Sequence, residues 1–294
     1  MGRKKTLTLN QRHLAVGWIF ILPAALLIFI FAFYPMFQAL WLSLQKGIAQ
    51  NLSFNGLNNY TRIAKDKIFR QAIFNTVFYL IIQVPVMLLM ALIFASILNS
   101  KSIRFKGIFR TLIFLPCATS LVSYSMIFRS LFSNDGFINM TLRNLGMNPI
   151  GWFQNAWTAR IVIIVALLWR WTGYNMVFYL AGLQNIEYSV YEAARIDGAS
   201  PIQSFFKITV PLLKPTILLT TIMSVNGTLQ LFDESFNLTN GGPGNQTITM
   251  AHYIYNTCFV ASPNFSYAAA LSILILVMVA ILSYFQMKAG DSRD

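Results

Sequence analysis

Polar side chains gather in an otherwise apolar stretch of the sequence, residues 213–234. The polar members are Ser224, Asn226, Thr228, Gln230, Asp233 and Glu234. Exposing these groups to lipid is costly, so part of the stretch must face a cavity or a neighbouring helix. On a helix with 100° per residue, one side carries Ser224, Thr228 and Leu231. The nearly opposite side carries Asn226, Gln230 and Asp233, which periodicity alone favours as the cavity side. Hydrogen bonding between helices is the alternative for either set.

Arg170 lies near the middle of a second apolar stretch, residues 160–183. An arginine at the centre of a membrane costs about 2.5–3.5 kcal/mol on translocon scales, so its guanidinium needs water, a carboxylate or the oxygens of a bound molecule. Bidentate hydrogen bonding suits it to carboxylates or paired hydroxyls, which indicates an acidic or multiply hydroxylated ligand. An ion pair with Asp233, with Glu234 or with another subunit is the alternative.

Between these two stretches, residues 187–211 have the pattern of two short helices with a break. Ser189 followed by Glu192 has the spacing of a capping box, and so has Ser200 followed by Gln203. Pro201 suits the first position of the second helix. The sequence therefore predicts helix starts next to Ser189 and Ser200.

Gly198 stands where the first of these helices ends, a position that favours left-handed backbone or close approach by another chain. The second helix carries an apolar stripe at helical spacing, formed by Ile202, Phe205, Phe206, Leu212 and Leu213. A capped helix pair with such a stripe suits docking to a soluble partner. The alternative is a connecting loop whose stripe packs on its own bundle.

The composition indicates an integral membrane protein. Of 294 residues, 56% are hydrophobic and only 11% are charged, against about 25% charged in an average soluble protein. Six apolar stretches are long enough to cross about 30 Å of hydrocarbon. We place them at 14–40, 73–98, 109–131, 160–183, 213–234 and 267–287. The first reaches Leu44 without a sensible cleavage site, so we expect a retained helix and not a signal peptide.

The basic residues favour cytoplasmic termini. Net charge is +13, and of the 22 Lys and Arg more fall on the segments that would be inside with this orientation than on those outside. The first outer loop, near residues 45–72, is an exception because it carries five basic residues. Because the basic residues lie mostly between apolar runs, we expect contact with membrane lipid and not with nucleic acid.

Several other function classes lack their signatures. The sequence has no His-Glu-x-x-His motif, and its two histidines, His13 and His252, lie outside the apolar stretches. It has no phosphate-binding Gly-x-x-x-x-Gly-Lys-Ser/Thr loop, so any energy from ATP must come from a partner. An ion-coupled secondary transporter of a polar solute is the alternative, but it would need buried acidic relays, and the chain has only nine Asp and Glu. We expect no catalytic residue, metal or cofactor, and no disulfide between Cys117 and Cys258.

Residues 187–211 also carry a family resemblance. Glu192, Ala193 and Ala194 are followed by Gly198, and Ile208 and Pro211 close the pattern. This spacing resembles the EAA loop of binding-protein-dependent ABC importer permeases, apart from Val210 where leucine is usual. The segments 54–60, 109–116, 181–184 and 238–249 are similar to those of carbohydrate permeases of the maltose-transporter type.

The resemblance implies an all-α type I ABC importer transmembrane domain with six transmembrane helices. Residues 1–13 would be a cytoplasmic tail, 14–70 the first transmembrane helix with an external loop, and 71–290 the domain with the other five helices. It implies a second homologous permease subunit, two ATPase subunits and an extracytoplasmic sugar-binding protein. Coupling to the ATPase would fall to Glu192, Ala193, Ala194, Gly198, Ile208 and Pro211.

The same resemblance assigns the sugar-contacting positions. They are Arg170, Trp171, Tyr174, Ser224, Thr228 and Leu231, with Leu167 aligned beside them. Leu231 departs from the family pattern, where an amide stands. Sugars have apolar C–H faces and hydroxyl rims, so aromatic rings beside amides and hydroxyls suit them. The expected function is the permease subunit of an ATP-driven importer of oligosaccharides in the cell membrane, forming half of the translocation pathway.

Overall fold

The fold is known from a computed structural model that describes residues 9–47, 51–100, 103–260 and 262–290. Part of the orientation argument depends on basic residues that lie outside these ranges, namely Arg3, Lys4, Lys5, Lys101 and Arg293. The described chain is helical, apart from one short antiparallel pair of β1 (Gln45–Lys46) and β2 (Ser53–Phe54).

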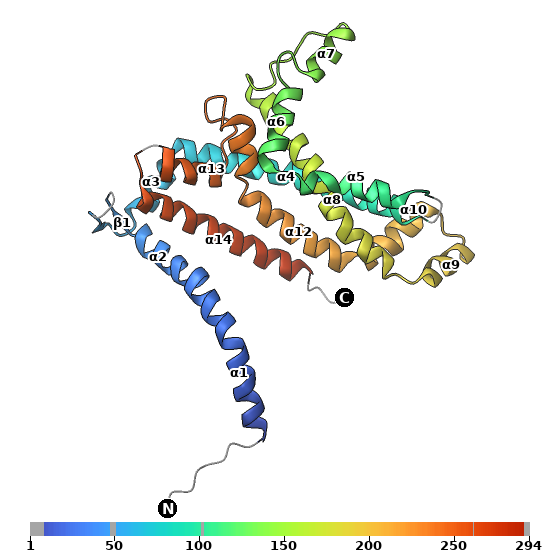
Figure 1. Ribbon diagram of the computed structural model, residues 1–294, viewed down its shortest axis with the longest axis horizontal. Helices are drawn as coiled ribbons and strands as arrows, with labels where there is room; N and C mark the ends of the chain where they lie inside the picture. Colours follow the sequence, from blue (N-terminus) through green and yellow to red (C-terminus); the bar gives the residue numbers. More distant parts are fainter. Residues whose placement is uncertain (1–8, 48–50, 101–102, 261, 291–294) are drawn as a thin grey trace, which may run out of the picture.

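Long helices lie side by side in the body of the molecule (Figure 1). They are α4 (Lys67–Asn99), α5 (Lys106–Ala118), α8 (Ala156–Gln184), α12 (Lys214–Leu229) and α14 (Phe265–Gly290). Two of them begin at side-chain caps: Asp66 accepts from the backbone N–H groups of Ile68 and Phe69 at 2.9 and 3.1 Å, and Asn155 accepts from Trp157 at 2.8 Å.

A glycine permits the close packing of α8 on α5. A Cβ added to Gly173 would lie 1.9 Å from the carbonyl oxygen of Ile113. Small residues at such contacts let the backbones of two membrane helices approach closely, which maximises van der Waals contact where no hydrophobic drive exists between helices. This contact fixes the part of α8 that carries the candidate site residues.

The N-terminal helix projects from this body (Figure 1). It runs through α1 (Leu9–Ile28), the π-helical turn η1 (Phe29–Phe33) and α2 (Tyr34–Ser43), and the apolar span within it is not buried by the rest of the chain. Its end is tied to α3 (Asn58–Lys65), where Asn59 Nδ2 donates to the carbonyl oxygen of Ser43 at 2.7 Å.

Two of the six expected spans are bent. Four described helices are long and apolar enough to cross a membrane, and the number rises to six if each of two bent pairs is one span. In the first pair, α5 turns by 98° into α6 (Leu121–Leu131) at Thr119 and Ser120. The second pair, residues 201–212 and α12, bends by 69°. The expected straight span at 109–131 is therefore broken, and the one at 213–234 ends at Leu229.

Short helices occupy the two ends of the bundle (Figure 1). One end holds α9 (Tyr188–Ile196) and α10 (Pro201–Ser204), followed by η2 (Phe205–Thr209) and α11 (Val210–Leu212). The other end holds α3 and α13 (Met250–Tyr255), with η3 (Ser235–Thr239) before α13 and η4 (Asn256–Val260) after it, whereas α7 (Phe137–Asn144) projects from the body beyond α6. Cys117 and Cys258 are free thiols, as expected.

Candidate functional site

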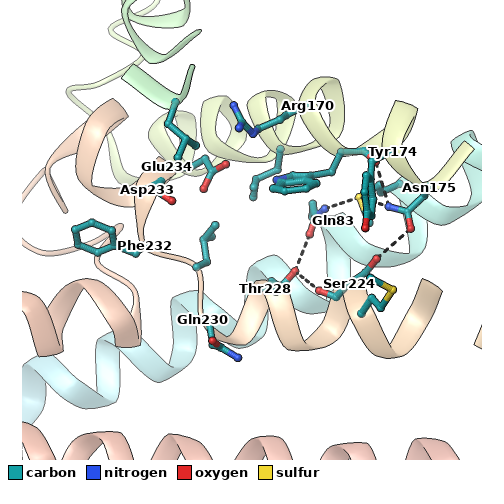
Figure 2. A pocket seen from close by; sticks show the side chains of 17 residues that line it. Gln83, Arg170, Tyr174, Asn175, Ser224, Thr228, Gln230, Phe232, Asp233 and Glu234 are labelled. Atoms are coloured by element: carbon teal, nitrogen blue, oxygen red, sulfur yellow. Dashed lines mark hydrogen bonds between the residues drawn. The ribbon is translucent and has the colours of Figure 1, made fainter. Parts of the chain in front are cut away.

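A cavity of about 390 Å³ lies among α4, α8, α12 and the segment that follows α12 (Figure 2). All six residues that the resemblance assigned to the sugar line it: Arg170, Trp171, Tyr174, Ser224, Thr228 and Leu231. Leu167 lines it as well. The helices thus bring two stretches about fifty residues apart in sequence to the same space.

Amide and hydroxyl groups connect three helices on one side of this cavity (Figure 2). Thr228 Oγ1 in α12 donates to Gln83 Oε1 in α4 at 3.2 Å, and Gln83 Nε2 contacts Met87 Sδ at 3.0 Å. Ser224 Oγ donates to Asn175 Oδ1 in α8 at 3.4 Å. These side chains already satisfy one another, so a ligand here would compete for or add to existing hydrogen bonds.

Aromatic side chains of α8 form another part of the wall. The rings of Trp171 and Tyr174 meet edge to face, with centroids 5.8 Å apart, and Tyr174 contacts Phe178 in the same way at 5.1 Å. Trp171 and Tyr174 are half-buried, so part of each ring remains accessible. The cavity therefore combines apolar faces with hydroxyl and amide groups.

Charged groups gather at the other side of the cavity, near the break between α5 and α6. Arg170 Nη1 donates to the carbonyl oxygen of Thr119 at 3.2 Å, and its guanidinium lies 4.8 Å from the centre of the Tyr124 ring. The one ion pair between described side chains joins Arg143 and Asp135. The intrachain ion pair proposed for Arg170 with Asp233 or Glu234 is therefore not formed in the described structure.

The helical-wheel prediction for residues 224–233 holds only in part. Ser224 and Thr228 face the cavity, but Asn226 faces the other way and accepts a hydrogen bond from Ser283 Oγ of α14 at 3.2 Å. Because α12 ends at Leu229, the chain beyond it does not follow 100° per residue. Gln230, Leu231 and Asp233 consequently all line the cavity, although the wheel placed them on opposite sides.

Some cavity residues were not identified as such from the sequence. They include Gln83, Met87, Asn175 and Glu234. Gln83 had a usable signal, because it is a lone amide within a long apolar run and such residues face the interior of a bundle. Asn175 had a weaker one, since it directly follows Tyr174 but points to a neighbouring side of the helix.

The segment 187–211 forms the expected helix pair. Gly198 has φ +77°, the left-handed conformation predicted for it, and an added Cβ would meet no atom of this chain within 4 Å. The second capping box is confirmed: Gln203 N donates to Ser200 Oγ at 3.2 Å, and Ser200 N donates to Gln203 Oε1 at 2.8 Å. The first is wrong, because α9 begins after Glu187, to whose carboxylate Ser189 donates.

The predicted apolar stripe divides between two environments. Leu213 is buried against the bundle and Phe205 packs beside it, whereas Ile202 and Phe206 are 70% and 65% exposed. Leu213 and Phe205 therefore pack on the bundle, whereas Ile202 and Phe206 remain available for docking to a partner. Of the six coupling candidates, Glu192, Ala193, Gly198 and Pro211 are exposed, Ile208 is half-buried and Ala194 is buried.

At the opposite end, hydrogen bonds fix the segment between η3 and α13. Ser235 Oγ donates to the carbonyl oxygen of Thr247 at 3.0 Å and lies 2.8 Å from His252 Nδ1. His252 is fully buried, and burial lowers the pKa of its imidazole to about 4. Arg160 of α8 donates to the carbonyl oxygen of Gln246 at 2.9 Å, which ties the same segment to the bundle.

Comparison with known families decides the class of this protein. Residues 65–290 match the family described as the binding-protein-dependent transport system inner membrane component. The chain belongs to this family. It is therefore a membrane-spanning permease of a binding-protein-dependent transport system. This family membership excludes the alternative function, an ion-coupled secondary transporter.

Three relatives of this permease are named sugar permeases. The chain is 51% identical to the lactose transport system permease protein LacF of Rhizobium radiobacter, over 94% of each chain. It is 36% identical to the arabinooligosaccharides transport system permease protein AraP of Halalkalibacterium halodurans, over 94% of this chain and 90% of AraP. It is 30% identical to the trehalose/maltose transport system permease protein MalF of Thermococcus litoralis, over 100% of this chain and 99% of MalF.

A solved structure shares the fold of this permease. It is a bacterial ABC transporter involved in the import of the acidic polysaccharide alginate, with a TM-score of 0.84 at 21% identity over 96% of each chain. This likeness confirms the expected ABC importer transmembrane fold.

Proposed function

We propose that this chain is one of two permease subunits of an ATP-driven carbohydrate importer and forms half of its translocation pathway. The observation that carries the proposal is the cavity inside the bundle, where Trp171 and Tyr174 offer aromatic faces beside the hydroxyls of Ser224 and Thr228. Aromatic faces pack on sugar C–H groups, and hydroxyls and amides bind the rim. The names of the lactose, arabinooligosaccharide and trehalose/maltose relatives support the same class of solute.

In this proposal the six predicted substrate positions contact the sugar in turn as it passes. Arg170, Trp171, Tyr174, Ser224, Thr228 and Leu231 line a single space, and none of them is a catalytic group. A second, homologous permease would supply the facing half of the pathway. The sugar would be delivered by an extracytoplasmic sugar-binding protein.

ATP hydrolysis in this proposal belongs to two partner ATPase subunits. They would contact the segment 187–211, which presents the exposed side chains of Glu192, Ile202 and Phe206. The left-handed backbone of Gly198 and the open space around it leave room for close approach by such a partner. Both termini and this segment would then lie in the cytoplasm, and Asn245 would lie outside.

Cysteine accessibility tests the orientation. In a background without Cys117 and Cys258, cysteines would replace Arg104 and Asn245, both of which are exposed. We expect a membrane-impermeant thiol reagent to label position 245 from outside and position 104 only after the membrane is opened. Labelling of both positions from the same side would contradict the orientation.

Uptake tests the function itself. A strain lacking this chain would be offered radiolabelled lactose, maltose and arabinan oligosaccharides, with and without the restored gene. We expect restored, ATP-dependent uptake of at least one of these sugars. Restored uptake of amino acids or inorganic ions, with no saccharide transported, would reject the carbohydrate assignment.

A further inference from the structure

The charged side chains on the cavity wall indicate which class of saccharide the cavity accepts. Among the described residues that line the cavity, only three are charged: Arg170, Asp233 and Glu234. One guanidinium therefore faces two carboxyl groups. Figure 2 shows that the three side chains lie at the same end of the cavity, away from the chain of Gln83, Thr228 and Ser224.

These groups are buried and incompletely paired. Glu234 is only 3% exposed, its carboxyl group lies close to the Tyr124 hydroxyl, and its Oε1 atom has no hydrogen-bond partner within normal distance. Arg170 is 6% exposed, and its Nε has no partner either, although Nη1 is held by Thr119. Because both groups are buried, their charges act in a low-dielectric part of the wall, where they are screened less than at a protein surface.

The balance of charge determines which molecule that is. An isolated arginine in an apolar wall attracts carboxylates through bidentate hydrogen bonds. Here Asp233 and Glu234 offset the guanidinium at the same end. With both carboxyl groups ionised the end carries a net negative charge, and with one of them protonated it is neutral. In neither state does the cavity wall attract an anion.

We infer that the cavity selects uncharged saccharides over acidic ones, because the carboxyl groups of Asp233 and Glu234 offset the positive charge of Arg170 on the cavity wall. The inference rests on the proposed function and narrows it. Arg170 alone indicated either an acidic ligand or a multiply hydroxylated one. The carboxyl groups of Asp233 and Glu234 disfavour the acidic ligand, so the multiply hydroxylated ligand remains. Glu234 and Asp233 are thus specificity-determining residues that the sequence resemblance did not assign.

Matched sugar pairs test this inference without any mutation. The purified complex of both permeases and the ATPases, free of binding protein, would be titrated with lactose and maltose. Each would be compared with the same disaccharide whose terminal hydroxymethyl group is oxidised to a carboxylate. We expect the uncharged member to bind at least about tenfold more tightly, because the carboxylate adds like charge to a low-dielectric site. Equal or tighter binding of the acidic member would overturn the inference.

Variants locate the selectivity. The double variant Asp233→Asn, Glu234→Gln leaves Arg170 uncompensated, so we expect the acidic sugar to gain at least about tenfold relative to the uncharged one. Asp135→Asn, which removes an exposed carboxylate that does not line the cavity, should leave the ratio unchanged. An unchanged ratio in the double variant, when it assembles normally, would also overturn the inference.

The two proposals fail in different ways. If the complex binds saccharides but prefers acidic ones, the inference on charge is wrong and the carbohydrate importer stands. If it binds neither member of any pair and restored cells take up no sugar, the carbohydrate assignment is wrong, and the inference that rests on it is overturned as well.

Discussion

Arg170 in α8 donates a hydrogen bond at 3.2 Å to the carbonyl oxygen of Thr119, the residue at which α5 ends and the chain turns by 98° into α6. The break leaves carbonyl groups without helical partners, and a buried carbonyl needs a donor from elsewhere. One side chain therefore serves the bend and the cavity at the same time. Its guanidinium holds the broken helix in place and lines the same cavity as Asp233 and Glu234.

Replacing Arg170 with leucine tests this double role. We expect Arg170→Leu to lower sugar uptake at least about tenfold, because the charge balance of the cavity and one ligand donor are lost. Loss of the bond to Thr119 should also lower the free energy of unfolding by about 1–3 kcal/mol. Uptake by membrane vesicles and co-purification with the other subunits measure the two effects. Arg170→Lys, which keeps the charge, is the matched control.

The result separates the two interpretations of Arg170. Lower uptake with normal assembly assigns it to the pathway. Failed assembly in Arg170→Leu, with normal assembly in Arg170→Lys, would instead assign it to a structural role at the bend.

Gly198→Asp is expected to abolish ATP-driven uptake while the protein still inserts in the membrane. The variant places a charged side chain at a left-handed turn where this chain itself leaves open space, so the obstruction falls on a docked partner. Gly146→Asp is the control, because Gly146 has φ +75°, has equally open surroundings and follows α7, which lies apart from α9 and α10 (Figure 1). Both variants pay a similar backbone cost of about 1–2 kcal/mol.

Uptake and membrane insertion would be compared for the two glycine variants. The role of segment 187–211 in coupling requires that only Gly198→Asp loses uptake and co-purification of the ATPase. Equal losses in both variants would trace the effect to backbone strain, and normal uptake in Gly198→Asp would remove the coupling proposal.

The fold was predictable where it depends on apolar length, and not where it depends on contacts between helices. Runs of apolar residues placed α4, α8 and α14 nearly correctly. The same runs continue through residues 109–131 and gave no sign of the bend, apart from Pro116 three residues before it. The bend is stabilised by a donor from Arg170, fifty-one residues away, which no local pattern contains.

The site was predictable to the point where α12 ends. Ser224 and Thr228 face the cavity because α12 is regular there, whereas Leu231 and Asp233 lie beyond its end and do not follow the helical period. Asn226 was favoured by periodicity but is bonded to Ser283 of another helix. Glu234 went unrecognised as a cavity residue because its position depends on how the chain folds back after Leu229.

Asp66→Asn is expected to destabilise the end of the bundle opposite to α9 and α10. The carboxylate of Asp66 caps α4 and also accepts hydrogen bonds from the hydroxyls of Tyr253 and Tyr267, at 2.5 and 2.7 Å. Asparagine retains the cap through its oxygen but cannot accept both tyrosine hydroxyls with its NH₂ group. We expect the free energy of unfolding to fall by about 1–3 kcal/mol.

Thermal unfolding of the purified complex in detergent measures this effect. Burial raises the pKa of Asp66, but the hydrogen bonds from Tyr253, Tyr267 and two backbone N–H groups outweigh it, so the net pKa lies below the usual value. The stabilisation by Asp66 is therefore present above about pH 4 and is lost as the pH falls through the lowered pKa. Tyr267→Phe should reproduce part of the loss, and Asp135→Asn should cause none. An unchanged melting temperature in Asp66→Asn would contradict the assignment.

The stability of the segment between η3 and α13 is expected to depend on pH through His252. Its imidazole is fully buried next to Ser235, and burial lowers its pKa to about 4, whereas the unfolded chain has a histidine pKa of about 6.5. Between these values the unfolded state binds a proton that the folded state excludes. The free energy of unfolding should therefore fall, by an amount on the order of 1–3 kcal/mol, as the pH is lowered from 6.5 to 4. His252→Gln keeps a hydrogen-bonding side chain beside Ser235 but cannot titrate, so its melting temperature should change less over this range than that of the wild type. His13→Gln, which replaces the other histidine of the sequence, should keep the wild-type profile. Melting temperatures of the three proteins at half-unit steps of pH measure the difference, and parallel profiles for His252→Gln and the wild type would show that His252 does not control it.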